Sequence, residues 1–279
     1  MRILAESPIF TVPRDNPNME DVERIVDSKV ESLNKDQQRM FYDLTNIYGD
    51  AHGRPLGISR TNVLPLGSNA RSGGVFLEAS RINHSCRHNA QNTWNESIKR
   101  LTVHALREIE EGQEITISYL GSASSYAERQ AFLKKTFRFD CGCQLCSLPS
   151  AQRRRSDTRL RKIRDLDGQV GSFFWATDRL ELKPALRTIH EILDLLKEEG
   201  IWDASIVRAY NDAYKTATES GDVTRARVFA ERAYETRLII EGDDSPITMK
   251  FKKRAKKISP EVPQGLREAG FENWLWMLD

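Results

Sequence analysis

Residues 81–90 read R-I-N-H-S-C-R-H-N-A, and this stretch decides how the rest of the chain is interpreted. It begins with an Asn-His pair, continues through a Ser and a Cys, and closes with a second His-Asn pair. Downstream, residues 112–119 read G-Q-E-I-T-I-S-Y, which predicts a turn and then a short strand that ends on Tyr119. Alone, an Asn-His pair indicates a turn and a strand-end tyrosine indicates packing, so a function for these residues depends on the whole pattern.

The other cysteines of the chain form one short cluster at Cys141, Cys143 and Cys146. Four cysteines with this distribution make a poor disulfide framework. In an intracellular chain, a Cys-x-Cys-x-x-Cys cluster favours a metal site. Structural zinc takes four ligands, and Cys86 is the only cysteine outside the cluster. The alternative is three thiols without a metal and one buried core cysteine.

Length and composition set the broad class of the protein. The 279 residues suffice for two domains of ordinary size, and 39% hydrophobic with 29% charged residues is typical of a globular protein. No apolar run approaches the roughly 20 residues of a membrane span. The charged Glu6 follows the first apolar residues closely, so no secretory signal is present and an intracellular location is expected. A formal net charge of +2 predicts no nucleic-acid partner.

The first half of the chain mixes strand and helix patterns. Residues 2–12 alternate loosely and predict a β-segment. Residues 19–48 predict helix, with Asn18 as a cap and an Asn34–Gln37 capping box in the middle. The glycine-rich residues 49–57 indicate a plain loop.

Two further elements are expected after residue 90. A hairpin is predicted between residues 91–94 and 100–105, in which alternate residues are apolar. Ser125 and Glu128 form a second capping box, which predicts a helix that reaches about Phe137.

Beyond Pro149 strand patterns become scarce. Residues 153–155, three arginines, indicate a charged linker. Three helices are then predicted, the first between Pro184 and Gly200 and the third after Gly221-Asp222. Their apolar residues at helical spacing are Leu186, Ile189, Leu193, Leu196, Ile206, Tyr210, Ala213, Ala217, Ala226, Phe229, Ala233 and Tyr234.

Two features close the chain. The basic run 250–257 fits a solvated helix face better than a nuclear address or a site for an acidic partner. The apolar residues 274–278 are expected to pack on the helices.

Residues 81–90, the Gly112–Tyr119 strand and the three clustered cysteines, in this order, resemble the C-terminal half of a SET-domain protein lysine methyltransferase. The resemblance implies an α+β fold in which residues 1–149 form a SET β-fold. A helical insertion would span about 18–48, and a post-SET zinc segment would span 137–149. Residues 150–279 resemble the tetratricopeptide-like helical domain of the SET and MYND-domain family. No cysteines remain to build a MYND module.

The resemblance implies a role for each motif residue. Tyr119 matches the catalytic tyrosine and also contacts the cofactor. Asn83 and His84 match the pair that holds S-adenosylmethionine, and Phe139 matches the aromatic residue on the adenine ring. Asn62 matches a residue that lines the cofactor channel, although a turn asparagine bonded to its own backbone is an equal alternative. The implied zinc ligands are Cys86, Cys141, Cys143 and Cys146.

The sequence departs from the family pattern in three places. No Gly-x-Gly cofactor loop is present, so we expect the chain to begin after that loop, with an N-terminally incomplete SET fold and weak cofactor binding. His88 stands where the pattern has a proline, and Phe137 stands where related enzymes often have a second active-site tyrosine.

The implied function is S-adenosylmethionine-dependent methylation of a lysine in a histone or non-histone protein, with one bound zinc ion. The alternative is a catalytically inactive SET-like module that contains zinc and binds other proteins. A lysine-containing peptide is the expected partner, with no nucleic acid and no membrane, and the chain is expected to be a monomer. The expected location is the nucleus, the cytoplasm or both.

Overall fold

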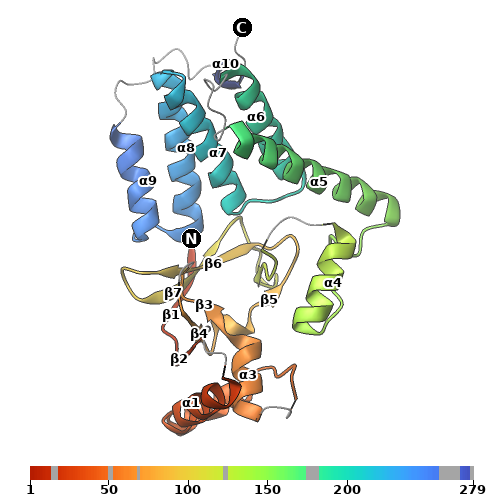
Figure 1. Ribbon diagram of the computed structural model, residues 1–279, viewed down its shortest axis with the longest axis vertical. Coiled ribbons are helices and arrows are strands. Elements are labelled where there is room, and N and C mark those ends of the chain that lie inside the picture. The colour runs from red at the N-terminus through yellow and green to blue at the C-terminus, as the bar shows by residue number, and fades with distance from the viewer. Residues whose placement is uncertain are drawn as a thin grey trace. The chain divides into compact units, whose positions relative to one another are not determined.

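The computed structural model describes residues 1–13, 18–49, 53–67, 70–121, 125–173, 182–257 and 271–276 (Figure 1). The chain forms two compact units. The first unit comprises Met1–Tyr119 and Gln130–Cys141, and the second comprises Leu120–Arg129 and Gly142–Asp279. The assignment of residues 1–149 and 150–279 to two domains stays a prediction.

Short strands in three small sheets form the centre of the first unit. The sheets have the strand orders β1-β7-β6, β2-β4-β3 and β5-β8. The first two sheets are antiparallel, whereas β5 and β8 run parallel. The strands are β1 (Arg2–Glu6), β2 (Phe10–Pro13), β3 (Leu64–Pro65), β4 (Ser72–Val75), β5 (Asn83–His84), β6 (Ala90–Asn95), β7 (Arg100–Ala105) and β8 (Thr116–Ile117).

The predicted strands are confirmed with two changes. The β-segment at 2–12 divides into β1 and β2, and the strand expected at 114–119 is regular only at Thr116–Ile117. The predicted hairpin is β6–β7. Because β7 lies between β1 and β6, its polar residues Thr102 and His104 are buried along with Leu101 and Val103.

Helices α1 (Met19–Glu31) and α2 (Lys35–Tyr42) follow their predicted caps. The Asn18 side chain accepts hydrogen bonds from two backbone N–H groups of the first turn of α1. Asn34 and Gln37 form the reciprocal capping box of α2. The buried face of α1 carries Val22, Val26 and Val30, which pack with residues of β2, α2 and α3 in one apolar cluster.

The loop expected at 49–57 is wrong over its last part, because α3 spans Arg54–Asn62. Gly53, with a φ of 72°, is the residue that caps this helix, and Pro55 lies in its first turn, where its missing N–H is tolerated. Leu56 and Ile58 are fully buried. The glycine and proline that indicated a loop therefore begin a helix whose stability comes from tertiary packing.

The second unit is helical. The linker expected at 153–155 is wrong, because these arginines lie inside α5. Polar contacts hold its first half: Ser156 donates a 2.6 Å hydrogen bond to the buried carboxylate of Glu199, which also pairs with Arg159. The helices of this region are α4 (Tyr126–Phe137), which also contributes to the first unit, α5 (Ser150–Phe173), α6 (Leu182–Glu198), α7 (Ala204–Glu219), α8 (Val223–Glu241), α9 (Pro246–Lys257) and α10 (Phe271–Trp276).

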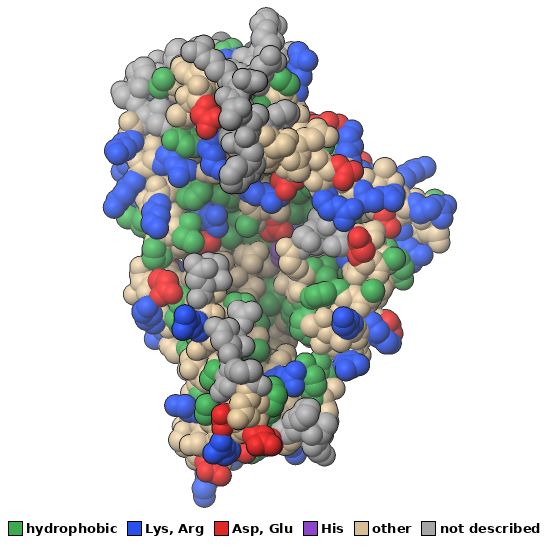
Figure 2. All heavy atoms as spheres, in the orientation of Figure 1, with side chains coloured by type: hydrophobic (Ala, Val, Ile, Leu, Met, Phe, Trp, Pro, Cys, Tyr) green, Lys and Arg blue, Asp and Glu red, His purple; other side chains and the backbone are tan. Residues whose placement is uncertain are grey.

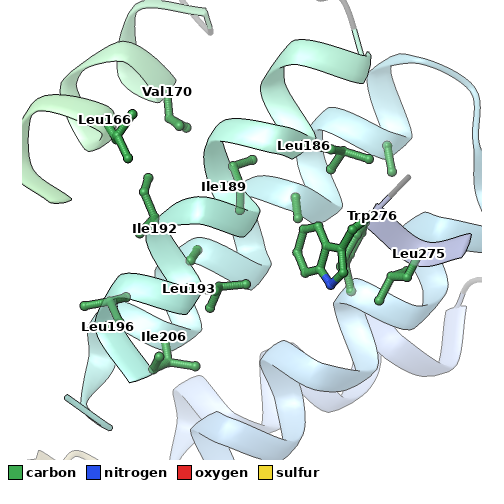
Figure 3. Packing of buried hydrophobic residues seen from close by; sticks show 14 of the residues in the cluster. Leu166, Val170, Leu186, Ile189, Ile192, Leu193, Leu196, Ile206, Leu275 and Trp276 are labelled. Carbon is green, nitrogen blue, oxygen red and sulfur yellow. The ribbon is translucent and has the colours of Figure 1, made fainter. Parts of the chain in front are cut away.

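One apolar cluster forms the core of the second unit, and its side chains come from α5, α6, α7, α8 and α10 (Figure 3). The predicted apolar residues Leu186, Ile189, Leu193 and Phe229 are all fully buried. Leu275 and Trp276 are buried in the same cluster, which confirms the packing expected for that part of residues 274–278. Residues 277 and 278 lie outside the described residues.

The basic run lies on α9, and Figure 2 shows Lys and Arg side chains gathered over α9 and α5. Lys250, Lys253 and Lys256 are exposed, as expected for a solvated helix face. Within the described part of the chain, none of the helices combines the length and apolar character that crossing a membrane requires.

Candidate functional site

The parallel pair β5–β8 brings the two motifs of the site together. Asn83 is paired with Thr116 and His84 with Ile117. The backbone N–H of Ser85 continues the ladder with a 3.1 Å hydrogen bond to the Ile117 carbonyl. Tyr119 follows two residues after the end of β8, and its ring and backbone N–H lie beside the His84 ring.

Asn89 holds this short pairing in register. Its side-chain Oδ1 accepts a 2.8 Å hydrogen bond from the Thr116 N–H, and its Nδ2 donates to the Glu114 carbonyl at 2.9 Å. Its backbone N–H donates to the Thr116 carbonyl, and its backbone carbonyl accepts from Leu106. Asn89 is almost completely buried. Asn89 belongs to the motif at residues 81–90, but the sequence alone did not indicate this role.

Glu6 of β1 fixes the approach to the motif. Its carboxylate accepts hydrogen bonds from the consecutive backbone N–H groups of Leu77, Glu78 and Ala79, the shortest at 2.8 Å. These groups begin the 3-10 turn Ala79–Arg81, and a carboxylate on backbone N–H groups forms strong charge-assisted bonds. Nothing in the sequence signals this contact, because Glu6 lies more than 70 positions away.

Tyr119 is half-buried, and its hydroxyl donates a 2.8 Å hydrogen bond to the Ile82 carbonyl. Burial raises the pKa of Tyr119 above its ordinary value of 10.0, and the nearby negative charge of Glu114 raises it further. The group is therefore a neutral phenol at physiological pH. Because its proton is directed at Ile82, the lone pairs of the oxygen remain available to accept a hydrogen bond.

Tyr119 belongs to a connected group of aromatic rings. The centroid of the Phe137 ring lies 4.8 Å from that of Tyr119, and the His84 ring lies at 5.3 Å. Phe139 lies 6.3 Å from His84, and Phe132 lies 6.1 Å from Phe137. None of these aromatic residues is fully buried, so the group presents apolar surface of the kind that binds a flat ring or an aliphatic chain.

Asn83 is exposed, and its Nδ2 donates a 2.8 Å hydrogen bond to the carboxylate of Glu114. In a parallel pair, neighbouring residues of a strand direct their backbone groups to opposite edges. Since Ser85 bonds to Ile117, the backbone N–H and C=O of His84 face the edge of β5 away from β8. Glu114 was not identified from the sequence.

Asn62 lies at the end of α3 and is buried. Its Nδ2 donates to the Thr45 and Ile58 carbonyls, each at 2.7 Å, and its backbone carbonyl accepts from the Ser80 hydroxyl at 2.8 Å. The bond to Ile58 is a local contact with the backbone, of the kind expected if Asn62 has a structural role instead of a cofactor role. The cofactor role of Asn62 stays a prediction.

The four predicted zinc ligands converge. The sulfur atoms of Cys86, Cys141, Cys143 and Cys146 all lie within 4.8 Å of one another, and no disulfide joins them. The Sγ atoms of Cys86 and Cys141 are 3.9 Å apart. A tetrahedral zinc–thiolate site with bonds of about 2.3 Å requires sulfur atoms about 3.8 Å apart. The donor set and its spacing therefore fit one zinc ion.

Helix α4 holds the cysteine segment. The side chain of Gln130 makes two hydrogen bonds to the backbone of Cys141, at 2.8 and 2.9 Å. The guanidinium of Arg129, whose side chain is 3% exposed, lies 4.0 Å from Cys146 Sγ and 3.7 Å from Asp157. The guanidinium therefore places a buried positive charge beside the cysteine cluster. The amphipathic pattern of the helix gave no reason to expect Arg129 inside.

Comparison with known proteins agrees with this geometry. The family model described as "SET domain" matches residues 3–120. "Histone-lysine N-methyltransferase set5" of Schizosaccharomyces pombe is 32% identical over 253 residues, which are 90% of this chain and 75% of that protein.

Two animal proteins match a shorter part of the chain. "Protein-lysine N-trimethyltransferase SMYD5" of Mus musculus is 37% identical over 81 residues, 28% of this chain and 20% of that protein. "Histone-lysine N-methyltransferase SMYD1" of Homo sapiens is 34% identical over 84 residues, 26% of this chain and 17% of that protein. The SET-domain model matches residues 3–120, and the Schizosaccharomyces pombe relative aligns with most of this chain. This chain therefore belongs to the SET-domain family of S-adenosylmethionine-dependent protein-lysine methyltransferases.

Proposed function

We propose that this chain methylates a lysine side chain of a protein, with Tyr119 as the catalytic residue. The observation that carries the proposal is the setting of the Tyr119 hydroxyl. It is a neutral phenol whose proton is held by the Ile82 carbonyl and whose ring lies against those of Phe137 and His84. Such an oxygen accepts a hydrogen bond from a neutral amine and orients the nitrogen lone pair away from itself.

The target amine must lose its proton before it reacts. For a lysine with a pKa of about 10.4, this costs roughly 4.6 kcal/mol at pH 7. An apolar surface such as that of Phe132, Phe137 and Phe139 disfavours the charged ammonium and so lowers this cost. The residues of the site thus favour the reactive form of the amine, and Tyr119 aligns it.

Bound S-adenosylmethionine supplies the methyl group on a positively charged sulfur. We propose that Asn83 and the outward backbone edge of His84 bind the amino-acid and adenine portions of this cofactor, and that Phe139 packs on its flat ring. The exposed amide of Asn83 and the half-buried ring of Phe139 support this assignment. The proposed role of Asn62 is less direct, since its amide bonds to Thr45 and Ile58.

We propose that Cys86, Cys141, Cys143 and Cys146 hold one structural zinc ion, which fixes the cysteine segment next to the β5 motif. Metal analysis of the purified chain should find one zinc per chain. Cys141→Ser should lose the ion, whereas Ser147→Ala, a matched change in the same segment, should retain it. A chain without zinc whose fold is intact would contradict this assignment.

The substrate is proposed from the relatives. The yeast and human relatives are named histone-lysine N-methyltransferases, so a histone is one candidate and would require a nuclear location. The mouse relative is named a protein-lysine N-trimethyltransferase, which leaves a non-histone protein as the other.

The test is transfer of labelled methyl groups from S-adenosylmethionine to histones and to a mixture of other proteins. Tyr119→Phe removes only the hydroxyl and should reduce the rate about 100-fold or more, as expected when an orienting group is lost. Tyr126→Phe is the control and should leave the rate unchanged. Equal rates for Tyr119→Phe and the parent would remove Tyr119 from the mechanism. No binding of S-adenosylmethionine at all would favour the inactive interaction module.

A further inference from the structure

We infer that the imidazole of His84 is a hydrogen-bonded bridge between the zinc ligand Cys86 and the backbone of Tyr119. His84 is then a positioning residue, and the metal cluster acts on the active site through it. This inference rests on the proposed zinc site and on the proposed role of Tyr119. It assigns to the imidazole nitrogens a task different from contact with the cofactor.

The first half of the bridge fixes the proton of the ring. The backbone N–H of Tyr119 lies 3.0 Å from Nδ1 of His84 and can only donate. Nδ1 must therefore be the unprotonated, accepting nitrogen. In a neutral imidazole the proton then belongs to Nε2, so the ring is a donor at its other end.

The second half of the bridge points at the metal site. Nε2 of His84 lies 3.4 Å from the Sγ of Cys86, within the range of an N–H···S hydrogen bond. A zinc-bound cysteine is a thiolate, which accepts such a bond and has no proton to offer in return. The direction is thus consistent along the whole path: Tyr119 N–H donates to the ring, and the ring donates to Cys86.

The path has a functional consequence because its far end is the residue that carries the catalytic hydroxyl. The regular pairing of β8 ends at Ile117, and beyond it the imidazole accepts from the backbone N–H of Tyr119, while the Tyr119 hydroxyl bonds to Ile82. Hydrogen bonds in a chain polarise one another, so a thiolate on Nε2 makes Nδ1 a better acceptor. Partners of this kind around metal ligands affect both the metal and the groups they orient.

The bridge also restricts how His84 meets S-adenosylmethionine. Both ring nitrogens are used within the protein, which leaves the ring face and the outward backbone edge of β5 for the cofactor. Contact through the backbone does not depend on the side chain. A substitution of His84 would therefore alter zinc retention and the position of Tyr119 before it altered any direct cofactor contact.

The first test needs no variant. Nitrogen-15 NMR of the zinc-loaded chain should show His84 as the neutral tautomer with its proton on Nε2. Finding the proton on Nδ1, or on both nitrogens, would overturn the bridge, because Nδ1 could not then accept from Tyr119.

The second test divides the bridge with two matched variants. His84→Asn keeps an acceptor near the position of Nδ1 but does not reach Cys86, so zinc retention against a competing chelator should weaken about tenfold while exchange of the Tyr119 amide hydrogen stays slow. His84→Gln keeps a donor near the position of Nε2 but loses the acceptor, so zinc retention should persist while the Tyr119 amide exchanges about fivefold faster. The Thr116 amide, which bonds to Asn89, is the internal control.

The outcomes separate the bridge from the proposal on which it rests. Zinc bound by the parent chain together with the same behaviour in both variants would overturn the bridge and leave the zinc site standing. A folded parent chain that binds no zinc would overturn both. The pattern in which each variant loses only its own end of the bridge would support the inference and could not arise from a general loss of packing.

Discussion

The segment around β5 and β8 and the helical core of the second unit are held together in different ways. The paired strands of the site are two residues long, and polar side chains bonded to backbone groups hold them, chiefly Asn89 and His84. The helices of the second unit share one apolar cluster that includes Phe229 and Trp276. The site therefore depends on the directions of a few hydrogen bonds, whereas the helical core depends on buried volume. Single substitutions should separate these two kinds of stability.

The largest effect is expected from Phe229→Ala in the helical core. Phe229 is fully buried, and its ring centroid lies 4.8 Å from that of Trp276. Truncation should reduce the free energy of unfolding by about 4 kcal/mol, through lost burial and a remaining cavity. Denaturant unfolding measures the loss, and hydrogen exchange should locate it in α6–α8. Phe229→Leu, which keeps most of the volume, should cost under about 1.5 kcal/mol.

An intermediate effect is expected from Asn89→Ala in the site. The change removes the side-chain hydrogen bonds to the Glu114 carbonyl and to Thr116, and it leaves the backbone N–H of the buried Thr116 without this partner. We expect a loss of about 2 kcal/mol, detected as faster exchange of the β5–β8 amides. Asn92→Ala in β6 is a matched control. The backbone carbonyl of Asn92 accepts a hydrogen bond from the Gln91 side chain, and the substitution keeps that carbonyl. If Asn89→Ala loosened the helices as much as the strands, the contrast between the two regions would fail.

The smallest effect is an ionic one at α10. A hydrogen bond and the charge of Arg232 hold the pKa of Glu272 below its ordinary value, against partial burial. A carboxyl whose pKa is lowered on folding adds stability above its unfolded pKa of about 4.3, and this stability is lost as the pH falls through the folded pKa. Glu272 is more than half exposed, so the contribution should stay under about 1 kcal/mol.

Thermal unfolding of the parent chain and of Glu272→Gln checks this prediction. The parent should be slightly more stable at pH 6, and the difference should shrink as the pH falls through the lowered pKa of Glu272. A difference that grew as the pH fell would show that the ion pair is not its source.

Sequence patterns predicted what is encoded locally. The Asn34–Gln37 capping box and the helix from Pro184 to Gly200 each depend on neighbouring residues, and the structure confirms both. Helix α3 was missed because Gly53 and Pro55 resemble loop residues until the burial of Leu56 and Ile58 is known.

The supports of the site could not be predicted in this way. The bonds from Glu6 to residues 77–79, and the place of Arg129 beside Cys146, join residues that are distant or whose charge suggests exposure. The motif indicates candidate site residues, and only the fold shows what holds them.

The position of α10 has a consequence for the time course of synthesis. Leu275 and Trp276 fill the same core as Leu160 of α5, and Arg225 of α8 bonds to the carbonyls of Trp274 and Leu275. During translation, at roughly 5–20 residues per second, α5–α8 emerge several seconds before the residues that complete their core. Through that interval the nascent helices expose the surface that Trp276 later covers, and chaperones that bind apolar segments have their best opportunity to act there.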